Sequence, residues 1–280
     1  MMDKSISFIS QLYHFLVYSI KEPEMQLDKA MLIISIDIDV GTRELGVINK
    51  GRNDANVNDR ISEYRIGEIE EAAFPFFAEA FSSVDIPVTF AVRGQLTEVN
   101  SSLLDSLLKS PVKHDIGAHG YYHRAFTSLS FSEAEKELNK ISVGMKKFGI
   151  VPKSFVFPRN RVAHLELLEK YGYECYRNYG NFMCDSIYIE KRGQLFDIHP
   201  SLYLDGNCST FPKRILDIAI VKRLPIHVWF HLWSFGETIE LIEKNLNNVL
   251  LPLLKYAKEK ERKGEMTLET MRSAGEKSKI

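Results

Sequence analysis

Short runs of β-branched and aromatic residues alternate with amphipathic stretches along this chain, and that alternation restricts the fold more than any other feature. The clearest run, residues 31–38, is apolar at nearly every position, as expected of a strand buried on both faces of a sheet. Strands that alternate with helices favour a parallel α/β architecture of about six or seven βα units, which form a closed or slightly incomplete barrel. The other strands are predicted at 87–92, 115–118, 154–157, 174–176, 186–198 and 226–231, and the helices at 66–81, 103–109, 132–149, 165–171, 215–223 and 237–260.

The chain is predicted to be organised around one domain. Its 280 residues suit a single α/β barrel, and no low-complexity linker or internal repeat interrupts them. We expect the barrel at 31–262, an N-terminal helical extension at 1–30 and a C-terminal tail at 263–280. Residues 42–65 are charged, rich in asparagine and without aliphatic periodicity, so this stretch is predicted to be a lid or a substrate loop.

Charge and cysteine content argue against two classes of protein. The formal net charge is −1, which gives no overall electrostatic basis for binding nucleic acid. The three cysteines form no C-x-x-C pair, and their odd number argues against a disulfide framework. The cysteine content fits a reducing compartment, and we expect a cytoplasmic protein.

The segment at 6–20 is apolar but carries several polar side chains. It is too short and too polar to span a bilayer, and no small-residue cleavage site of a signal peptide follows it. We predict an amphipathic helix packed on the body of the protein, with a peripheral membrane contact as the alternative. No transmembrane segment is expected.

Polar side chains gather where the predicted strands end. In a parallel barrel the carboxyl ends of all strands lie at one face, so side chains placed there are expected to converge on a single site. Asp37 and Asp39 end the first strand, His119 and His123 follow the third, Arg159 and Asn160 follow the fourth, and His231 ends the last.

The two histidines His119 and His123 are separated by three residues and can bind one metal ion from a single loop. The third ligand would be a carboxylate from the segment 35–41, and two imidazoles with one carboxylate and an open position form the usual catalytic zinc arrangement. Each motif alone is a weak signal, but their shared location at strand ends strengthens it. We therefore predict one divalent ion, with zinc as the default and cobalt, nickel or iron as alternatives.

The sequence His119-Gly-Tyr-Tyr-His123 resembles the second motif, H-S/T-x-x-H, of the polysaccharide deacetylase family (carbohydrate esterase family 4). The preceding residues 115–118 are similar to the family's E-I-G-N, and residues 87–90 to its A-T-F-F strand. Residues 35–39 resemble its first motif in the branch where two acids are spaced by one residue. The resemblance, which runs from about residue 31 to about residue 235, implies a distorted (β/α)7 TIM-like barrel.

The resemblance also implies roles for individual residues. Asp39, His119 and His123 would hold the metal, and Asp37 would be the general base for a water that attacks an N-acetyl carbonyl. His231 would protonate the leaving amine, and the substrate would be an N-acetylated sugar or glycan intermediate. Hydrolysis of another small or cyclic amide on the same fold is an alternative, and so is a catalytically inactive carbohydrate-binding relative.

Some positions depart from the family pattern. Gly120 stands where the family has Ser or Thr, and Val156 stands where it has an arginine that orients the base. Arg159 is predicted either to supply that charge from another angle or to bind an anionic group of the substrate, with a surface ion pair as the alternative. No segment matches the family's fourth motif, so Asp197 and His199 remain candidates for the group that tunes the catalytic histidine.

The remaining predicted substrate contacts are Tyr122, Trp233 and Arg93, together with Arg159. Aromatic faces can stack on a sugar ring, but packing inside the barrel is an equal alternative for both aromatic residues. His227 lies four residues before His231 on the same strand face, so it is predicted to be a buried structural histidine deeper in the barrel.

Overall fold

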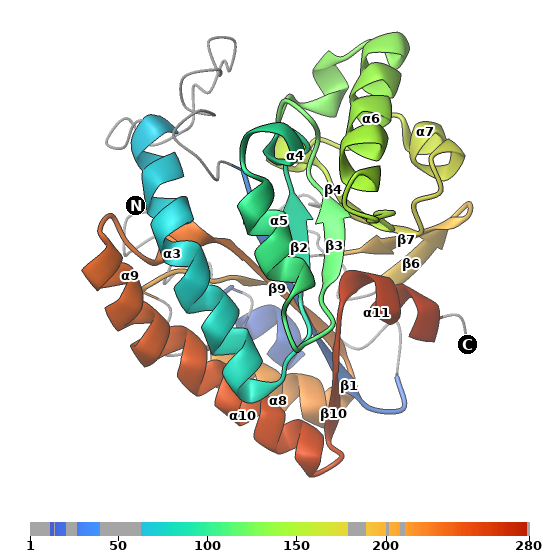
Figure 1. Ribbon diagram of the computed structural model, residues 1–280. Coiled ribbons are helices and arrows are strands. Elements are labelled where there is room, and N and C mark those ends of the chain that lie inside the picture. The colour runs from blue at the N-terminus through green and yellow to red at the C-terminus, as the bar shows by residue number, and fades with distance from the viewer. Residues whose placement is uncertain are drawn as a thin grey trace.

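The computed structural model describes residues 12–13, 15–20, 27–39, 63–178, 189–199, 202–207 and 211–278. A ten-stranded sheet forms its centre, in the order β6-β7-β5-β4-β3-β2-β1-β9-β8, with β10 paired to β1 beside β2 (Figure 1). Among the described strands every pairing is parallel except β6–β7. The strands are β1 (Ala30–Ile38), β2 (Thr89–Val92), β3 (Asp115–Ala118), β4 (Ser154–Val156), β5 (Cys175–Arg177), β6 (Ile189–Arg192), β7 (Leu195–Ile198), β8 (Leu202–Tyr203), β9 (Pro225–His231) and β10 (Met266–Glu269).

Helices cover the outer side of this curled sheet, whose hydrogen-bonded path runs from β6 to β8 without closing (Figure 1). The structure thus confirms the predicted α/β TIM-like barrel in a distorted, open form. The helices are α3 (Glu63–Val84), α4 (Leu96–Val99), α5 (Ser101–Leu108), α6 (Phe131–Lys146), α7 (Leu165–Lys170), α8 (Pro212–Lys222), α9 (Ile239–Asn245), α10 (Leu251–Arg262) and α11 (Met271–Lys277).

Strand β1 lies in the middle of the sheet. All nine of its residues are buried, and it pairs with β9 on one edge and with β2 and β10 on the other. A strand enclosed in this way can be apolar on both faces, which explains the continuous apolar run in the sequence. Near the end of β1, Asp37 is the register partner of His231 on β9 and of Ala91 on β2. The polar end of the strand therefore lies among neighbouring strand ends.

Helix α6 begins two residues earlier than a capping box at Ser132 and Glu135 would place it. Ser130 is the N-cap: its hydroxyl accepts from the Glu133 backbone N–H, and the Glu133 carboxylate accepts from the Ser130 backbone N–H. The S-x-x-E spacing occurs twice in this stretch, at 130 and at 132, and the first copy forms the cap.

The segment at 263–280 is not a tail, because it contributes β10 and α11 to the fold. Strand β10 runs parallel to the first half of β1, and Met271 and Ala274 of α11 are fully buried. The backbone N–H of Met271 donates to Thr89 Oγ1 on β2, at 2.8 Å. Elements of four and seven residues carry too little periodicity to be seen in a sequence, and their stability comes from this packing.

The described part of the N-terminal segment is helical and packs on the barrel, as predicted. The Tyr18 side chain is fully buried and donates to the Pro225 carbonyl at 2.8 Å, and the Phe15 and Phe211 rings lie 5.3 Å apart. Within the described residues, no helix is long and apolar enough to cross a membrane. Of the predicted loop at 42–65, residues 42–62 lie outside the described residues and 63–65 begin α3.

The docking of α11 gives a test of this correction. Thr89→Val keeps the shape of the side chain but leaves the Met271 N–H without its acceptor and removes a donor to Asp115, so we expect the free energy of unfolding to fall by about 1–3 kcal/mol. Urea unfolding measures the change, with Thr89→Ser, which keeps the hydroxyl, as the matched control. Equal stability of Thr89→Val and the unchanged protein would contradict the docking role.

Candidate active site

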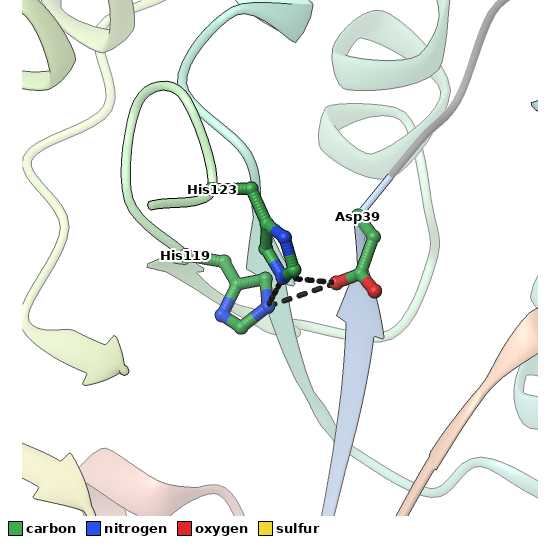
Figure 2. Close-up of side chains that lie close together, drawn as sticks. All are labelled: Asp39, His119 and His123. Carbon is green, nitrogen blue, oxygen red and sulfur yellow. Dashed lines mark hydrogen bonds and ion pairs between the residues drawn. The ribbon is translucent and has the colours of Figure 1, made fainter. Parts of the chain in front are cut away.

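Three side chains of types that can bind a metal ion converge at the carboxyl end of the sheet. Asp39 follows β1, and His119 and His123 lie in the loop after β3 (Figure 2). Oδ1 of Asp39 lies 2.8 Å from Nε2 of His119 and 3.4 Å from Nε2 of His123, and the two Nε2 atoms are 3.1 Å apart. All three side chains are buried. The predicted metal ligands are therefore brought together around one point.

The histidine loop is shaped so that both rings face Asp39. Gly120 and His123 have left-handed backbone angles, with φ of 65° and 59°, which fold the loop back on itself. A carbonyl can only accept a hydrogen bond, so Nδ1 of His119, 2.8 Å from the Val156 carbonyl, carries a hydrogen in the neutral ring. This leaves Nε2 of His119 as a lone-pair donor toward the centre of the cluster.

The donor set fits a divalent ion. Among the described residues, Oδ1 of Asp39 is buried and accepts no hydrogen bond of normal geometry. Bonds of about 2.0–2.1 Å to a tetrahedral zinc would place ligand atoms about 3.3 Å apart, close to the three separations seen here. Burial opposes the charge on Asp39, but His123 and the other imidazoles around it outweigh this and hold its pKa well below the usual range. The ligand carboxylate is therefore ionised.

Two other groups of side chains in the described part of the chain have the spacing of a metal site. One combines Asp37 and Asp39 with His231, and the other joins Glu190 and Asp197 to His199. Each already holds an internal cation: Arg177 pairs with Asp37, and Arg192 pairs with both Glu190 and Asp197. The cluster of Asp39 with the two loop histidines is thus the better site for an added ion.

The second carboxylate of β1, Asp37, is held by an arginine. Arg177 Nη1 donates to Oδ1 at 2.7 Å and Nη2 to Oδ2 at 2.5 Å, and both side chains are buried. Burial alone would raise the pKa of Asp37, but the charge of Arg177 and of nearby imidazoles reverses the direction and lowers it. Asp37 is therefore a fixed, ionised carboxylate next to the predicted metal ligands.

Arg177, at the end of β5, supplies the charge that sequence analysis sought in Arg159. In the parallel ladder Val156 of β4 is the register partner of Arg177, so the arginine reaches Asp37 from the next strand. Arg159 is exposed, and its assignment as the partner of the base is wrong. Arg177 directly follows the predicted strand 174–176, so the strand-end rule applied to that strand would have found it.

Several neighbours fix the guanidinium of Arg177. Ser35 Oγ and Asn160 Oδ1 accept from it at 3.0 and 3.3 Å, and its Cζ atom lies 4.5 Å from the centre of the Trp229 ring. Nε2 of His227 lies 2.8 Å from Ser35 Oγ, and burial lowers the pKa of this histidine to about 3. His227 is thus a buried, neutral histidine deeper in the barrel, as predicted.

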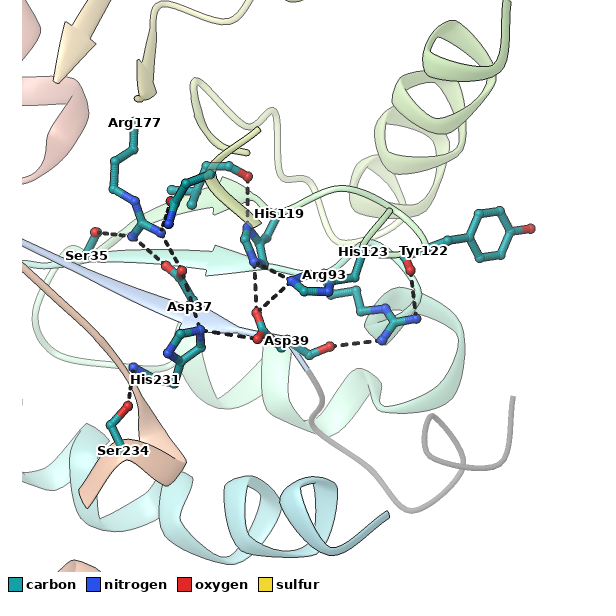
Figure 3. A network of polar contacts seen from close by, with 12 residues as sticks. Ser35, Asp37, Asp39, Arg93, His119, Tyr122, His123, Arg177, His231 and Ser234 are labelled. Atoms are coloured by element: carbon teal, nitrogen blue, oxygen red, sulfur yellow. Dashed lines mark hydrogen bonds and ion pairs between the residues drawn. The ribbon is translucent and has the colours of Figure 1, made fainter. Parts of the chain in front are cut away.

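His231 ends β9 beside both carboxylates. Its Nε2 lies 3.3 Å from Oδ2 of Asp39 and 3.8 Å from Oδ2 of Asp37 (Figure 3). Burial lowers the pKa of His231, but the attraction of Asp39 and Asp37 exceeds it and the pKa is raised. The Trp233 ring stacks on the imidazole at a centroid distance of 4.7 Å, so Trp233 lies at the site where a substrate contact was predicted.

Two predicted substrate residues lie elsewhere. Arg93 is fully buried and its donors are bound to the protein, so it does not face a substrate. The Tyr122 ring points away from the metal cluster (Figure 3), and its hydroxyl accepts from Lys140 of α6. Asp197 and His199 contact one another on the β7 side, and the carboxylates near His231 are Asp37 and Asp39.

Part of this chain matches a known protein family, and its fold occurs in solved structures. Residues 68–176 match the family model for polysaccharide deacetylase, a span that includes both loop histidines and ends one residue before Arg177. No curated protein matches the chain. A Mycobacterium smegmatis protein assigned as a polysaccharide deacetylase has a similar structure, with a TM-score of 0.65 and 14% identity over 91% of this chain and 93% of that one.

Two further solved structures share the fold. A PuuE allantoinase has a TM-score of 0.62 at 12% identity, covering 89% of each chain. A CE4 family pseudoenzyme from Bacillus anthracis has a TM-score of 0.50 at 14% identity, covering 89% of this chain and 66% of that one. Identities this low establish a common architecture and leave the chemistry to the residues of this chain.

The buried pair of Asp37 and Arg177 gives the prediction of this section. Arg177→Met strands a buried carboxylate, so we expect the free energy of unfolding to fall by about 3–5 kcal/mol. Adding Asp37→Asn should restore much of the loss, and the exposed Arg159→Met is the matched control. Chemical denaturation measures all four proteins. A larger loss in Arg159→Met than in Arg177→Met would show that Arg159 is the partner after all.

Proposed function

We propose that this chain is a metal-dependent hydrolase that removes an N-acetyl group from a sugar or glycan intermediate. The match of residues 68–176 to the polysaccharide deacetylase model supports this proposal. The observation that carries the proposal is the pairing of two different carboxylate environments at one strand end. Asp39 faces two imidazole nitrogens and offers a ligand oxygen, while Asp37 is held ionised by Arg177. One is suited to bind a metal and the other to accept a proton.

Asp39, His119 and His123 would hold the ion, with zinc as the default and cobalt, nickel and iron as alternatives. When bound there, the ion would supply Lewis-acid chemistry, lowering the pKa of a water and polarising the acetyl carbonyl. Asp37 would act as the general base for the attacking water, and Arg177 keeps its carboxylate ionised and oriented for that role.

His231 is the proton donor in this proposal. Cleavage of the C–N bond needs an acid at the leaving amine, and the two carboxylates beside His231 favour its protonated form. Trp233 stacks on the His231 ring, which places it beside the proposed acid as the predicted substrate contact. Arg159 is exposed and follows β4, and it is the proposed contact for an anionic group of the substrate.

Two departures from the family pattern motivate the inactive-relative alternative: Val156 in place of the family arginine, and the unmatched fourth motif. Arg177 removes the first motive, because it makes the two-point contact to Asp37 from the neighbouring strand. Hydrolysis of a small or cyclic amide remains the second candidate on the same machinery. The cytoplasmic location and the peripheral membrane contact through 6–20 stay predictions.

Metal content is the first test. Protein purified without chelator or histidine tag should contain about one equivalent of divalent metal by mass spectrometry, because the three ligands form one site. The double variant His119→Ala/His123→Ala should contain none. If neither protein retains zinc after soaking and desalting, the hydrolase proposal is wrong.

Asp37→Asn separates the base from the ligands. The variant should keep its metal and lose turnover by about 10²–10⁴-fold, since the amide cannot accept the proton. Acetate release from N-acetylated sugars and sugar nucleotides is the assay, and ring opening of cyclic amides by the unchanged protein would favour the second candidate. Loss of the metal along with activity would show that Asp37 is itself a ligand.

A further inference from the structure

The loop that carries the two histidines is gripped by two buried side chains of opposite charge. Arg93, which directly follows β2, donates from Nε to the Tyr121 carbonyl at 3.4 Å and from Nη2 to the Tyr122 carbonyl at 3.2 Å. Glu137 of α6 accepts through Oε2 from the backbone N–H of Tyr121 at 3.0 Å and of Tyr122 at 3.3 Å. Every backbone polar group of these two residues is therefore bound by one charged side chain or the other.

The same arginine reaches a metal ligand. Its Nη1 donates to the backbone carbonyl of Asp39 at 3.2 Å, so one guanidinium connects the end of β1 with the histidine loop (Figure 3). Gln95 Oε1 also accepts from Nη2, at 2.5 Å. Next to it, the Gly94 N–H donates to the Gly120 carbonyl at 2.8 Å, which ties the start of the loop to the same segment.

Glycine at position 94 is required by this close approach. A Cβ there would lie 2.8 Å from both the Tyr121 ring and the Ile141 side chain, and 3.3 Å from the Tyr121 backbone. Because such contacts are too short, the segment after β2 can touch the loop only without a side chain at this position.

Burying two charges is costly unless their hydrogen bonds are satisfied, so their presence here needs a reason. Glu137 is 1% exposed and Arg93 0% exposed. The second oxygen of Glu137 accepts from Nε of Arg124 at 2.7 Å, so the loop also supplies the countercharge. The loop has no side chain at Gly120, and two of its residues, Gly120 and His123, have left-handed backbone angles. Hydrogen bonds from outside the loop therefore hold its shape.

We infer that Arg93 and Glu137 are positioning residues that hold the two-histidine loop and Asp39 in the geometry that binds the metal. They act through the backbone of Tyr121, Tyr122 and Asp39 and touch neither metal nor substrate. Arg93 and Glu137 together are called the clamp. This inference rests on the proposed function, because it assigns the clamp to the metal site.

The first experiment does not depend on a metal. Amide hydrogen exchange, followed by NMR on the metal-free protein, should show slow exchange at Tyr121 and Tyr122. Glu137→Gln should speed both amides by roughly tenfold or more, since a neutral amide oxygen is a weaker acceptor and its NH₂ group opposes Arg124. Glu135→Gln is the matched control on the same helix, because Glu135 pairs with Lys170 away from the loop. Unchanged exchange in Glu137→Gln would overturn the clamp.

The second experiment measures zinc affinity by competition with a chromophoric chelator. Glu137→Gln and Arg93→Lys should each raise the zinc dissociation constant by about 10–100-fold, the range found when partners of metal ligands are removed. Glu135→Gln should leave it unchanged. Arg124→Gln should change it less than Glu137→Gln, because it leaves the bonds to both backbone amides in place.

The outcomes separate this inference from the proposed function. Tight zinc binding by both Glu137→Gln and Arg93→Lys would overturn the positioning role and leave the hydrolase proposal intact. Absence of zinc binding in the unchanged protein would overturn the hydrolase proposal and the purpose assigned to the clamp, while amide exchange would still decide whether Glu137 holds the loop. All measurements are made at a temperature below the thermal unfolding midpoint of every variant, which circular dichroism determines. General unfolding is then excluded as the cause of faster exchange or weaker zinc binding.

Discussion

Two carboxylates at the end of one buried strand are the constraint on which the rest of the site depends. Asp37 lies near the end of β1 and Asp39 directly follows it, and both are nearly inaccessible to water. Two like charges so close together in a buried position must each have a cation or lose their ionisation. Arg177 is the cation paired with Asp37. The positive charge near Asp39 would come from the imidazoles and the ion that they would hold. The proposed division of roles between base and metal ligand follows from that arrangement.

Most of the fold and the convergence of the site could be predicted from the sequence, because strands have a two-residue period and parallel strands end at one face. Asp39, His119 and His123 came together for that reason, and His231 joined them from β9. Side-chain direction was beyond such reasoning. Tyr122 lies between two ligands in sequence yet points to α6, since a loop with two left-handed turns has no fixed periodicity.

Arg177 shows why matching a family motif position by position can miss a functional group. Val156 and Arg177 are register partners on neighbouring strands, so either position can deliver a guanidinium to Asp37. What the chemistry needs is a charge at one place in space, and a sheet offers more than one backbone position from which a long side chain can reach it. The short β10 and α11 were missed for a different reason: their stability is tertiary, and the contact of Met271 with Thr89 has no sequence signature.

The polar interior of this barrel is organised in two layers. The inner one contains the groups that would bind metal or move protons. The outer one contains Arg177, Arg93 and Glu137, whose hydrogen bonds hold those groups in position. Each outer charge makes several hydrogen bonds, which offsets the cost of removing it from water. These buried charges fix the geometry of the site as well as contributing to stability. Replacing Arg177 by an apolar residue would leave the Asp37 carboxylate buried and unpaired, and replacing Arg93 or Glu137 would free the loop that the proposed reaction needs held in place.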